Sequence, residues 1–289
     1  MPLTLADAIL RTVCYADIFD YPLTLPEIRK YLIGAKYSQG KERELKKKAD
    51  SIPQISRKSD FYFLKGKDVI VNYRKRREYF SSQKMIKLKK ILKFLSFFPF
   101  VLMIALTGTL AMNNADRDDD IDLLLVIDNR FIWTTRFFIV SILKVLGLYR
   151  NPKDKKASNK ICLNMYLDEN HLELPVAERD LYSAHEVIQL KPVYDKDGYY
   201  QRFRSANSWI AQFLPNSEVY HTRHVMNHTP GMNAKGNLME SFFRKIQLWK
   251  IKKNQTKEII RQGYLRFHPH DNRGDILKQF EVKLKNYKG

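Results

Sequence analysis

Cysteine is scarce in this sequence of 289 residues, which has only Cys14 and Cys162. The two lie far apart in apolar surroundings, so the sequence indicates neither a disulfide framework nor a zinc cluster. This usage fits a reducing compartment, and we expect a cytoplasmic protein. The first ten residues, MPLTLADAIL, also lack the basic start and long apolar region of a signal peptide, so nothing predicts export.

A hydrophobic run long enough to cross a membrane is missing as well. The most apolar stretch, residues 94–106, has thirteen residues and an internal proline, Pro99. A membrane-spanning helix needs about 20 apolar residues, so we expect no membrane partner. We interpret the stretch as the end of a buried helix, a break at Pro99 and a buried strand.

Acidic residues are too few to balance the basic ones. The chain has 31 Asp and Glu against 51 Lys and Arg, which gives a formal net charge of +20. This charge favours polyanionic partners such as nucleotides or nucleic acid. A hydrophobic content of 44% and an aromatic content of 12% still mark a chain that folds. At roughly 100 to 200 residues per domain, the length suggests two domains.

Residues 1–72 are expected to form a winged-helix-like domain. Apolar spacing and capping residues predict helices over residues 4–15, 24–34 and 40–52, and alternation around a Lys-Gly-Lys turn predicts a β-hairpin over residues 60–72. Three helices followed by a hairpin resemble a winged helix, which is often used on DNA. The basic third helix fits either DNA contact or a protein-docking module with a solvated face.

A basic linker helix is predicted over residues 73–98. Between Arg74 and Lys93 it has nine Lys or Arg residues against one Glu, with apolar residues at helical intervals. Contact with phosphates is one role for this charge, and a solvated helix face is the other. We expect this helix to join two domains.

Residues 177–289 are predicted to form a helical C-terminal region. Before it, residues 131–149 predict a helix, and residues 160–167 and 171–175 predict strands. Two polar clusters lie in the C-terminal region. The first fits either a zinc site or surface positions, and the second fits either a substrate contact or a structural turn. These clusters are His221, His224 and His228, and His268, His270 and Asp271.

Five aspartates crowd into residues 116–122, directly before an aliphatic run that predicts a buried strand. Strand alternation places Asp120 and Asp122 on one face, about 7 Å apart along the chain. Two adjacent carboxylates repel each other unless a cation lies between them. Hard oxygen ligands at this spacing suit Mg²⁺ that substrate phosphates also coordinate. The pair therefore predicts a divalent metal site.

A glycine-hydroxyl turn precedes the aspartate pair. Gly108 and Thr109 follow an apolar run that predicts another strand, and Asp120 comes eleven residues after Thr109. A glycine lets phosphate oxygens approach the backbone, and the neighbouring hydroxyl donates a hydrogen bond. Strand, turn, short helix and strand together predict one phosphate-handling unit, with Gly108 and Thr109 as nucleotide-binding residues.

The segments Thr107-Gly108-Thr109 and Asp120-Ile121-Asp122 resemble the motif of nucleotidyltransferases related to DNA polymerase beta. The resemblance implies an α+β fold over residues 99–176, a nucleotidyltransferase-type mixed sheet flanked by helices. It also implies transfer of a nucleoside monophosphate from a nucleoside triphosphate to an acceptor hydroxyl. Two Mg²⁺ ions held by Asp120 and Asp122 would stabilise the attacking and leaving oxygens.

Members of this superfamily usually have a third carboxylate on a later strand, and two candidates follow in KICLNMYLDEN. One is Asp168 at the strand end, which would complete the catalytic set with Asp120 and Asp122. The other is the neutral Asn164, which would weaken metal binding and base catalysis. With Asn164, the chain would be a weak or inactive nucleotidyltransferase-fold protein that acts as a DNA-binding regulator or interaction module.

Overall fold

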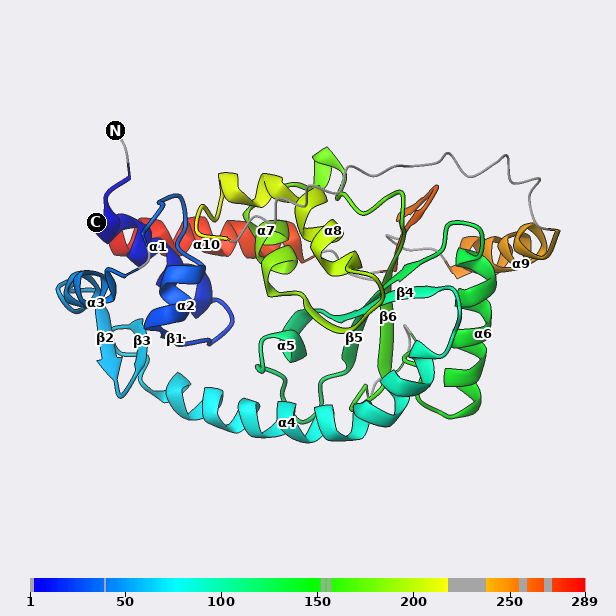
Figure 1. The fold of residues 1–289 in the computed structure, drawn as a ribbon. Helices are drawn as coiled ribbons and strands as arrows, with labels where there is room; N and C mark the ends of the chain where they lie inside the picture. The colour runs from blue at the N-terminus through cyan, green and yellow to red at the C-terminus, as the bar shows by residue number, and fades with distance from the viewer. Residues whose placement is uncertain are drawn as a thin grey trace.

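The structure is a computed structural model that describes residues 3–38, 40–151, 154, 157–217, 238–254, 259–267 and 272–288. Within these residues the chain forms a mixed α+β fold with two β-sheets. Figure 1 shows the first helices and the smaller sheet at one end of the molecule and the larger sheet toward the other. One long helix runs along a side between them.

Three helices open the chain, as the sequence predicts. α1 (Leu5–Asp17) is capped by the side-chain oxygen of Thr4, which satisfies one free amide of the first turn. α2 (Leu25–Lys30) begins with a capping box completed by Glu27. α3 (Glu42–Asp50) is a short helix with a mostly charged surface.

The predicted hairpin over residues 60–72 is wrong in position. The smaller sheet has the order β1-β3-β2, formed by β1 (Leu23–Thr24), β2 (Ile55–Lys58) and β3 (Phe61–Leu64). The hairpin turn therefore precedes β3 rather than following it. The apolar residues after β3 are instead the first turn of α4 (Val69–Ser96), where they pack against the small sheet.

The basic helix α4 begins at Val69 and not at residue 73, and it spans the distance between the two sheets (Figure 1). Its buried side includes Leu88 and Leu95, which pack under the larger sheet. Lys84 is buried although it is charged, because its ammonium group donates hydrogen bonds to the carbonyl oxygens of Arg117 at 3.0 Å and Asp119 at 2.6 Å. The helix thus supports the aspartate-rich loop.

The centre of the larger sheet is built from β4 (Val101–Leu106), β5 (Ile121–Ile127) and β6 (Ile161–Asp168). β4 and β5 are antiparallel, whereas β5 and β6 are parallel. A parallel pair needs a crossover connection, and α6 (Ile132–Val145) lies within it. These strands and α6 occur where the sequence predicts them.

Three further strands lie in residues 177–289, which were predicted as a helical region, so that prediction is incomplete. β7 (Lys191–Asp195), β8 (Ile259–Arg261) and β9 (Tyr264–Arg266) extend the larger sheet to the order β7-β4-β5-β6-β9-β8. β7 and β8 are edge strands, and all three are too short to show clear alternation. Residues 171–175, predicted as a strand, have no strand structure.

Helices cover both faces of the larger sheet (Figure 1). α7 (Leu181–Gln189) and α8 (Tyr199–Ala206) lie on one face, and α6 and α9 (Leu238–Asn254) lie on the other. α6 packs against α9, whereas α10 (Arg273–Lys288) packs against both α1 and α7. The C-terminal helix therefore ties the N-terminal helices to the sheet.

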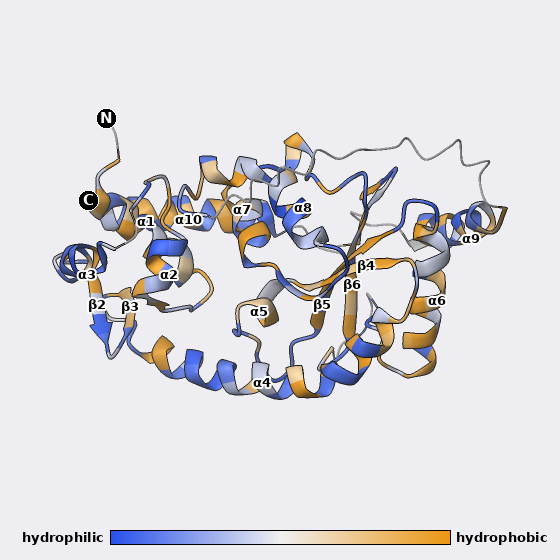
Figure 2. Cartoon of the chain, in the orientation of Figure 1, coloured by the Kyte–Doolittle hydropathy of each residue, from blue (hydrophilic) through white to orange (hydrophobic). Residues whose placement is uncertain are grey.

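Two extended hydrophobic cores follow from this layering. One joins buried residues of α1 and α2 with α7, α8, α10 and one face of the larger sheet. The other joins α4 and α6 with the opposite face. Figure 2 shows the hydrophobic colour along β4, β6 and much of α6, and the hydrophilic colour along much of α3 and α4. The N-terminal helices thus share a core with the sheet.

Short elements complete the described chain. They are α5 (Gly108–Ala111) and two 3₁₀ segments, Val176–Glu178 and Ser208–Gln212. None of the described helices is both long and apolar enough to span a membrane. The polar clusters His221, His224 and His228, and His268, His270 and Asp271, lie outside the described residues.

Candidate functional site

Gly108 forms the turn that leads from β4 into α5. Its φ of 62° lies in the left-handed region, which favours glycine. A Cβ atom at this position would also lie 2.9 Å from Oδ2 of Asp122. The backbone of Thr107 approaches the same strand, since its N–H donates to the Asp122 carbonyl at 3.1 Å. Only glycine fits both the backbone and the close approach of the carboxylate.

Asp120, Asp122 and Cys162 form a group that could hold a metal ion, with one ligand atom from each lying within 4.8 Å of the others. Asp120 directly precedes β5, Asp122 lies within it, and the register pairs Asp122 with Cys162 on β6. The local pattern in the sequence therefore predicted two of the three members. Cys162 was missed because only the strand register brings it there.

The environment of Asp122 is electrostatically strained. Burial and the charge of Asp120 raise the pKa of Asp122 to about 7, against the opposing effects of a hydrogen bond with Cys162 and the charge of Arg150. Arg150 also forms an ion pair with Asp120. A cation between the two carboxylates would relieve this repulsion, which is the arrangement expected of a divalent metal site.

The Cys162 thiol stays protonated in this setting. Burial and the charges of Asp122 and Asp120 raise its pKa well above the usual range for a thiol. A neutral thiol is a poor ligand for a hard cation, which prefers oxygen. The two aspartates are therefore the ligands in this group that suit a hard cation.

Asn164, and not Asp168, is the second residue of β6 that lies against Asp122. The Asn164 Nδ2 group donates hydrogen bonds to Oγ1 of Thr107 and Oδ1 of Asp122, both at 3.2 Å. The Asn164 side chain is only 3% exposed. Its Oδ1 has no hydrogen-bond partner among the described residues. A neutral amide, and not a third carboxylate, therefore lies against Asp122.

Asp168 does not join the aspartate pair, which corrects the expected three-carboxylate set. β6 is the neighbour of β5, but the register pairs Asp122 with Cys162 and Ile127 with Asp168. Six residues of strand at roughly 3.3 Å each separate the two positions by about 20 Å. Asp168 instead contacts Nδ1 of His171 at 2.7 Å and accepts a hydrogen bond from the Asn170 amide at 2.9 Å. Asp168 therefore stabilises the turn that follows β6.

Thr109 links the glycine turn to the acidic loop. Its hydroxyl donates to Oδ2 of Asp119 at 3.1 Å, and the same oxygen accepts from the Asp116 amide at 2.9 Å. Asp116 and Asp119 therefore shape the loop rather than adding ligands to the pair. Thr109 also lines the cavity beside Gly108, where the sequence predicted a nucleotide-binding residue.

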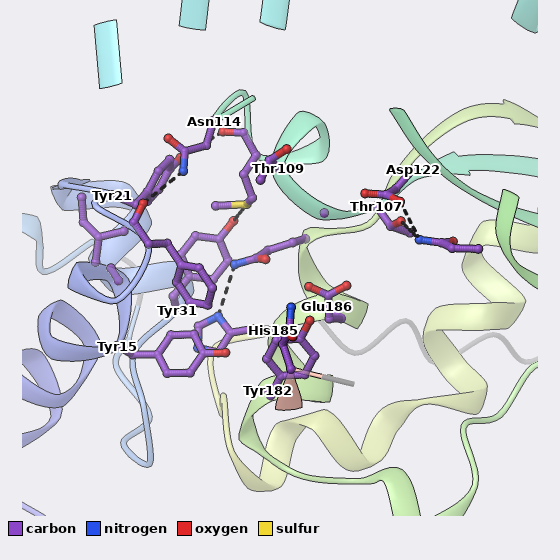
Figure 3. A pocket seen from close by; sticks show the side chains of 18 of the residues that line it. Tyr15, Tyr21, Tyr31, Thr107, Thr109, Asn114, Asp122, Tyr182, His185 and Glu186 are labelled. Carbon is purple, nitrogen blue, oxygen red and sulfur yellow. Dashed lines mark hydrogen bonds between the residues drawn. The ribbon is translucent and has the colours of Figure 1, made fainter. Parts of the chain in front are cut away.

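A cavity of about 370 Å³ opens beside this cluster. Its volume lies within the range of roughly 300 to 1,000 Å³ typical of small-molecule sites. Figure 3 shows Asp122 and Thr107 on one side of the cavity and the labelled tyrosines Tyr15, Tyr21 and Tyr31 on the other. The site is therefore shared between the larger sheet and the N-terminal helices.

α7 contributes two ionisable residues to the cavity wall. Burial raises the pKa of Glu186 to about 7, an effect that the charge of Arg266 partly opposes. Burial alone lowers the pKa of His185 to about 3, so its imidazole is neutral at neutral pH. Neither residue, nor Arg150, carried a local signal in the sequence, because only the tertiary fold brings them beside Asp122.

Comparison of the chain with protein-family models, with curated proteins and with solved structures finds no match. The functional proposal therefore depends on the geometry of these residues and on the motif resemblance.

Proposed function

We propose that this chain binds a nucleoside triphosphate with Mg²⁺ and transfers its nucleoside monophosphate to an acceptor hydroxyl. The single observation that carries the proposal is the close approach of Gly108 and Asp122 at the wall of the cavity, with Asp120 beside Asp122. The motif resemblance supports a nucleotidyltransferase-type arrangement for the larger sheet.

Each part of the cluster has a chemical role in this proposal. Asp120 and Asp122 supply the hard oxygen ligands, and Mg²⁺ bound there would neutralise charge on the α-phosphate. The Gly108 turn leaves room for phosphate oxygens close to the backbone. The acceptor oxygen forms a bond to the α-phosphorus as the bond to the pyrophosphate oxygen breaks, so pyrophosphate leaves.

The acceptor hydroxyl must also lose a proton, and Asn164 cannot take it because an amide is not a base at neutral pH. Glu186 lines the same cavity, and its pKa of about 7, raised by burial, suits a proton acceptor near neutral pH. Glu186 is therefore the carboxylate that we assign to this step. It comes from α7 and not from β6, where the resemblance would have placed it.

A second candidate function is nucleotide binding without turnover. Asn164 favours it, because this neutral amide, and not a third carboxylate, lies against Asp122. The superfamily usually has a third carboxylate to complete the metal ligands. In this case the chain would be a DNA-binding regulator or interaction module that responds to nucleotide, and the basic helices would provide its contacts. The two candidate functions share the metal and phosphate contacts and differ in whether nucleotidyl transfer follows binding.

Pyrophosphate release tests the proposal. The wild type is incubated with Mg²⁺ and each of the four ribonucleoside triphosphates over a panel of hydroxyl acceptors, beside an Asp120→Asn/Asp122→Asn double variant. The matched control is Asp118→Asn, which removes an exposed charge from the same acidic loop. We expect release by wild type and control and none by the double variant. Binding of triphosphate without release by the wild type would support the second candidate instead.

A further inference from the structure

The cavity beside Asp122 has two chemically different sides. The residues that we assign to the metal and the phosphates lie on the side of the larger sheet. The opposite side is lined by residues with aromatic rings, which come from α1, the end of α2, the loop between them and α7. They are Tyr15, Phe19, Tyr21, Tyr31, Tyr182 and His185. A ligand that fills this space needs an anionic end and a flat apolar end.

Tertiary contacts hold the aromatic side in place. The Tyr21 hydroxyl donates to Oε1 of Glu27 at 2.8 Å and lies 3.3 Å from the Met112 carbonyl oxygen, and the Tyr31 hydroxyl lies 3.4 Å from the Met112 sulfur. Met112 directly follows α5, the helix that begins at Gly108. The rings from the N-terminal helices are thus fixed against the turn that we assign to the phosphates.

His185 adds a polar group to this side. Its ring stacks on Tyr15 with a centroid distance of 4.1 Å and an interplanar angle of 12°. Its Nδ1 lies 3.4 Å from the Gln189 amide nitrogen, which can only donate, so the neutral ring has its proton on Nε2. Nε2 is buried and has no partner among the described residues. A buried donor without an acceptor is costly unless a ligand supplies one.

We infer that the aromatic side of the cavity is the subsite for the base of the nucleotide, and that the N-terminal helices contribute it. This inference rests on the proposed function and adds to it a role for residues 4–34, part of the region of residues 1–72 that the sequence associated with DNA or protein docking. A planar heteroaromatic base matches the flat aromatic lining of this side and presents acceptors to the His185 donor.

The test compares two probes, each with Mg²⁺: the four ribonucleoside triphosphates, one at a time, and inorganic tripolyphosphate. Binding is measured by calorimetry for the wild type and for Ala16→Leu, which adds bulk to the aromatic side without removing a ring. Ala6→Leu is the matched control, because it makes the same change on α1 outside the cavity. Circular dichroism confirms that each variant folds.

We expect the wild type to bind at least one nucleoside triphosphate at least about tenfold more tightly than tripolyphosphate, as base stacking requires. Ala16→Leu should lose this preference and keep its affinity for tripolyphosphate, whereas Ala6→Leu should behave as the wild type. Equal wild-type affinity for both probes would overturn the base subsite while leaving the phosphate site intact. Binding of neither probe by the wild type would overturn the proposed function as well.

A second variant keeps the test decisive if Ala16→Leu does not fold. His185→Phe keeps a ring on Tyr15 and removes the Nε2 donor, so the preference of the site among the four bases should fall by at least about threefold. An unchanged order and spread of the four affinities in His185→Phe, together with full binding, would contradict the subsite.

Discussion

The pKa of Asp122 would set the pH range in which the proposed metal site binds its ion. Burial and the charge of Asp120 raise this pKa to about 7, so the carboxyl is protonated below that pH and ionised above it. Because a metal competes with the proton, we expect Mn²⁺ affinity to rise with pH through about 7 and then to level off. Calorimetric titrations from pH 5.5 to 8.5 measure this. An affinity that is constant over this range would contradict the assignment of Asp122 as a ligand.

The same residue is expected to lower the stability of the folded chain. Because its folded pKa lies above the unfolded value of 3.8, the folded state prefers the protonated carboxyl, and the free energy of unfolding falls as pH rises from about 4 to about 7. Asp122→Asn removes the buried charge with little change of shape. At pH 8 it should raise the free energy of unfolding by on the order of 1 to 3 kcal/mol.

Denaturant unfolding without added metal measures the change, and Asp118→Asn, at an exposed position, serves as the control. The gain should shrink toward pH 5, where the wild-type carboxyl is itself neutral. A destabilised Asp122→Asn at pH 8 would contradict the idea that the charge is strained.

Local pattern was enough to predict part of the site. Gly108, Thr109, Asp120 and Asp122 all lie on two short segments whose residue types and spacing point to phosphate and metal. Local pattern did not predict which of Asn164 and Asp168 lies beside Asp122, because this depends on the pairing of β6 with β5. That register shifts between Leu123 and Leu124, beside Asn164, and a single strand sequence does not reveal the shift.

At the scale of elements, a glycine holds the end of β6 against the β8–β9 hairpin. Gly263 has a φ of 67°, and a Cβ there would lie 2.2 Å from Oδ2 of Asp168 and 2.0 Å from Nδ1 of His171. Gly263→Ala should therefore strain the backbone and displace the Asp168 turn. We expect it to lower the free energy of unfolding by about 2 kcal/mol or more.

Gly66→Ala is the matched control for this change. Gly66 has a similar φ of 85°, but a Cβ atom there would have no neighbour within 4 Å, so this variant isolates the backbone cost of roughly 1 kcal/mol. Thermal unfolding of both variants measures the difference. Equal losses in the two would show that the close contacts around Gly263 are not limiting.

Elements were predictable where their signals were long. α1, α4 and α6 have apolar residues at helical spacing, and the central strands β4, β5 and β6 have apolar runs long enough to be recognised. β8 and β9 have three residues each, and their pairing with β6 depends on contacts distant in sequence. The hairpin before α4 was misplaced because Ile70 and Val71 serve as the buried side of a helix turn rather than as a strand.

At the scale of the whole molecule, the net charge of +20 predicts binding to nucleic acid that is sensitive to salt. Lys46 and Lys47 lie on the exposed surface of α3, and other basic residues line α4. Phosphate contacts of this kind read little sequence, so affinity should fall by orders of magnitude between low and physiological salt for any duplex.

Fluorescence anisotropy with labelled DNA and RNA measures this affinity. Lys46→Glu/Lys47→Glu should weaken binding and reduce its salt dependence, whereas Glu42→Gln, on the same helix, should not weaken it. No binding of any nucleic acid at low salt would indicate that the N-terminal helices dock a protein or serve the cavity alone.

The most direct test of the proposed site is Mg²⁺ binding that depends on nucleotide. Mg²⁺ is titrated by calorimetry into the chain saturated with a non-hydrolysable nucleoside triphosphate, for the wild type, Asp120→Asn/Asp122→Asn and the control Asp118→Asn. We expect a binding event in the wild type and the control that the double variant has lost, with the fold unchanged by circular dichroism. Equal Mg²⁺ binding by the wild type and the double variant would contradict the assignment of the aspartate pair.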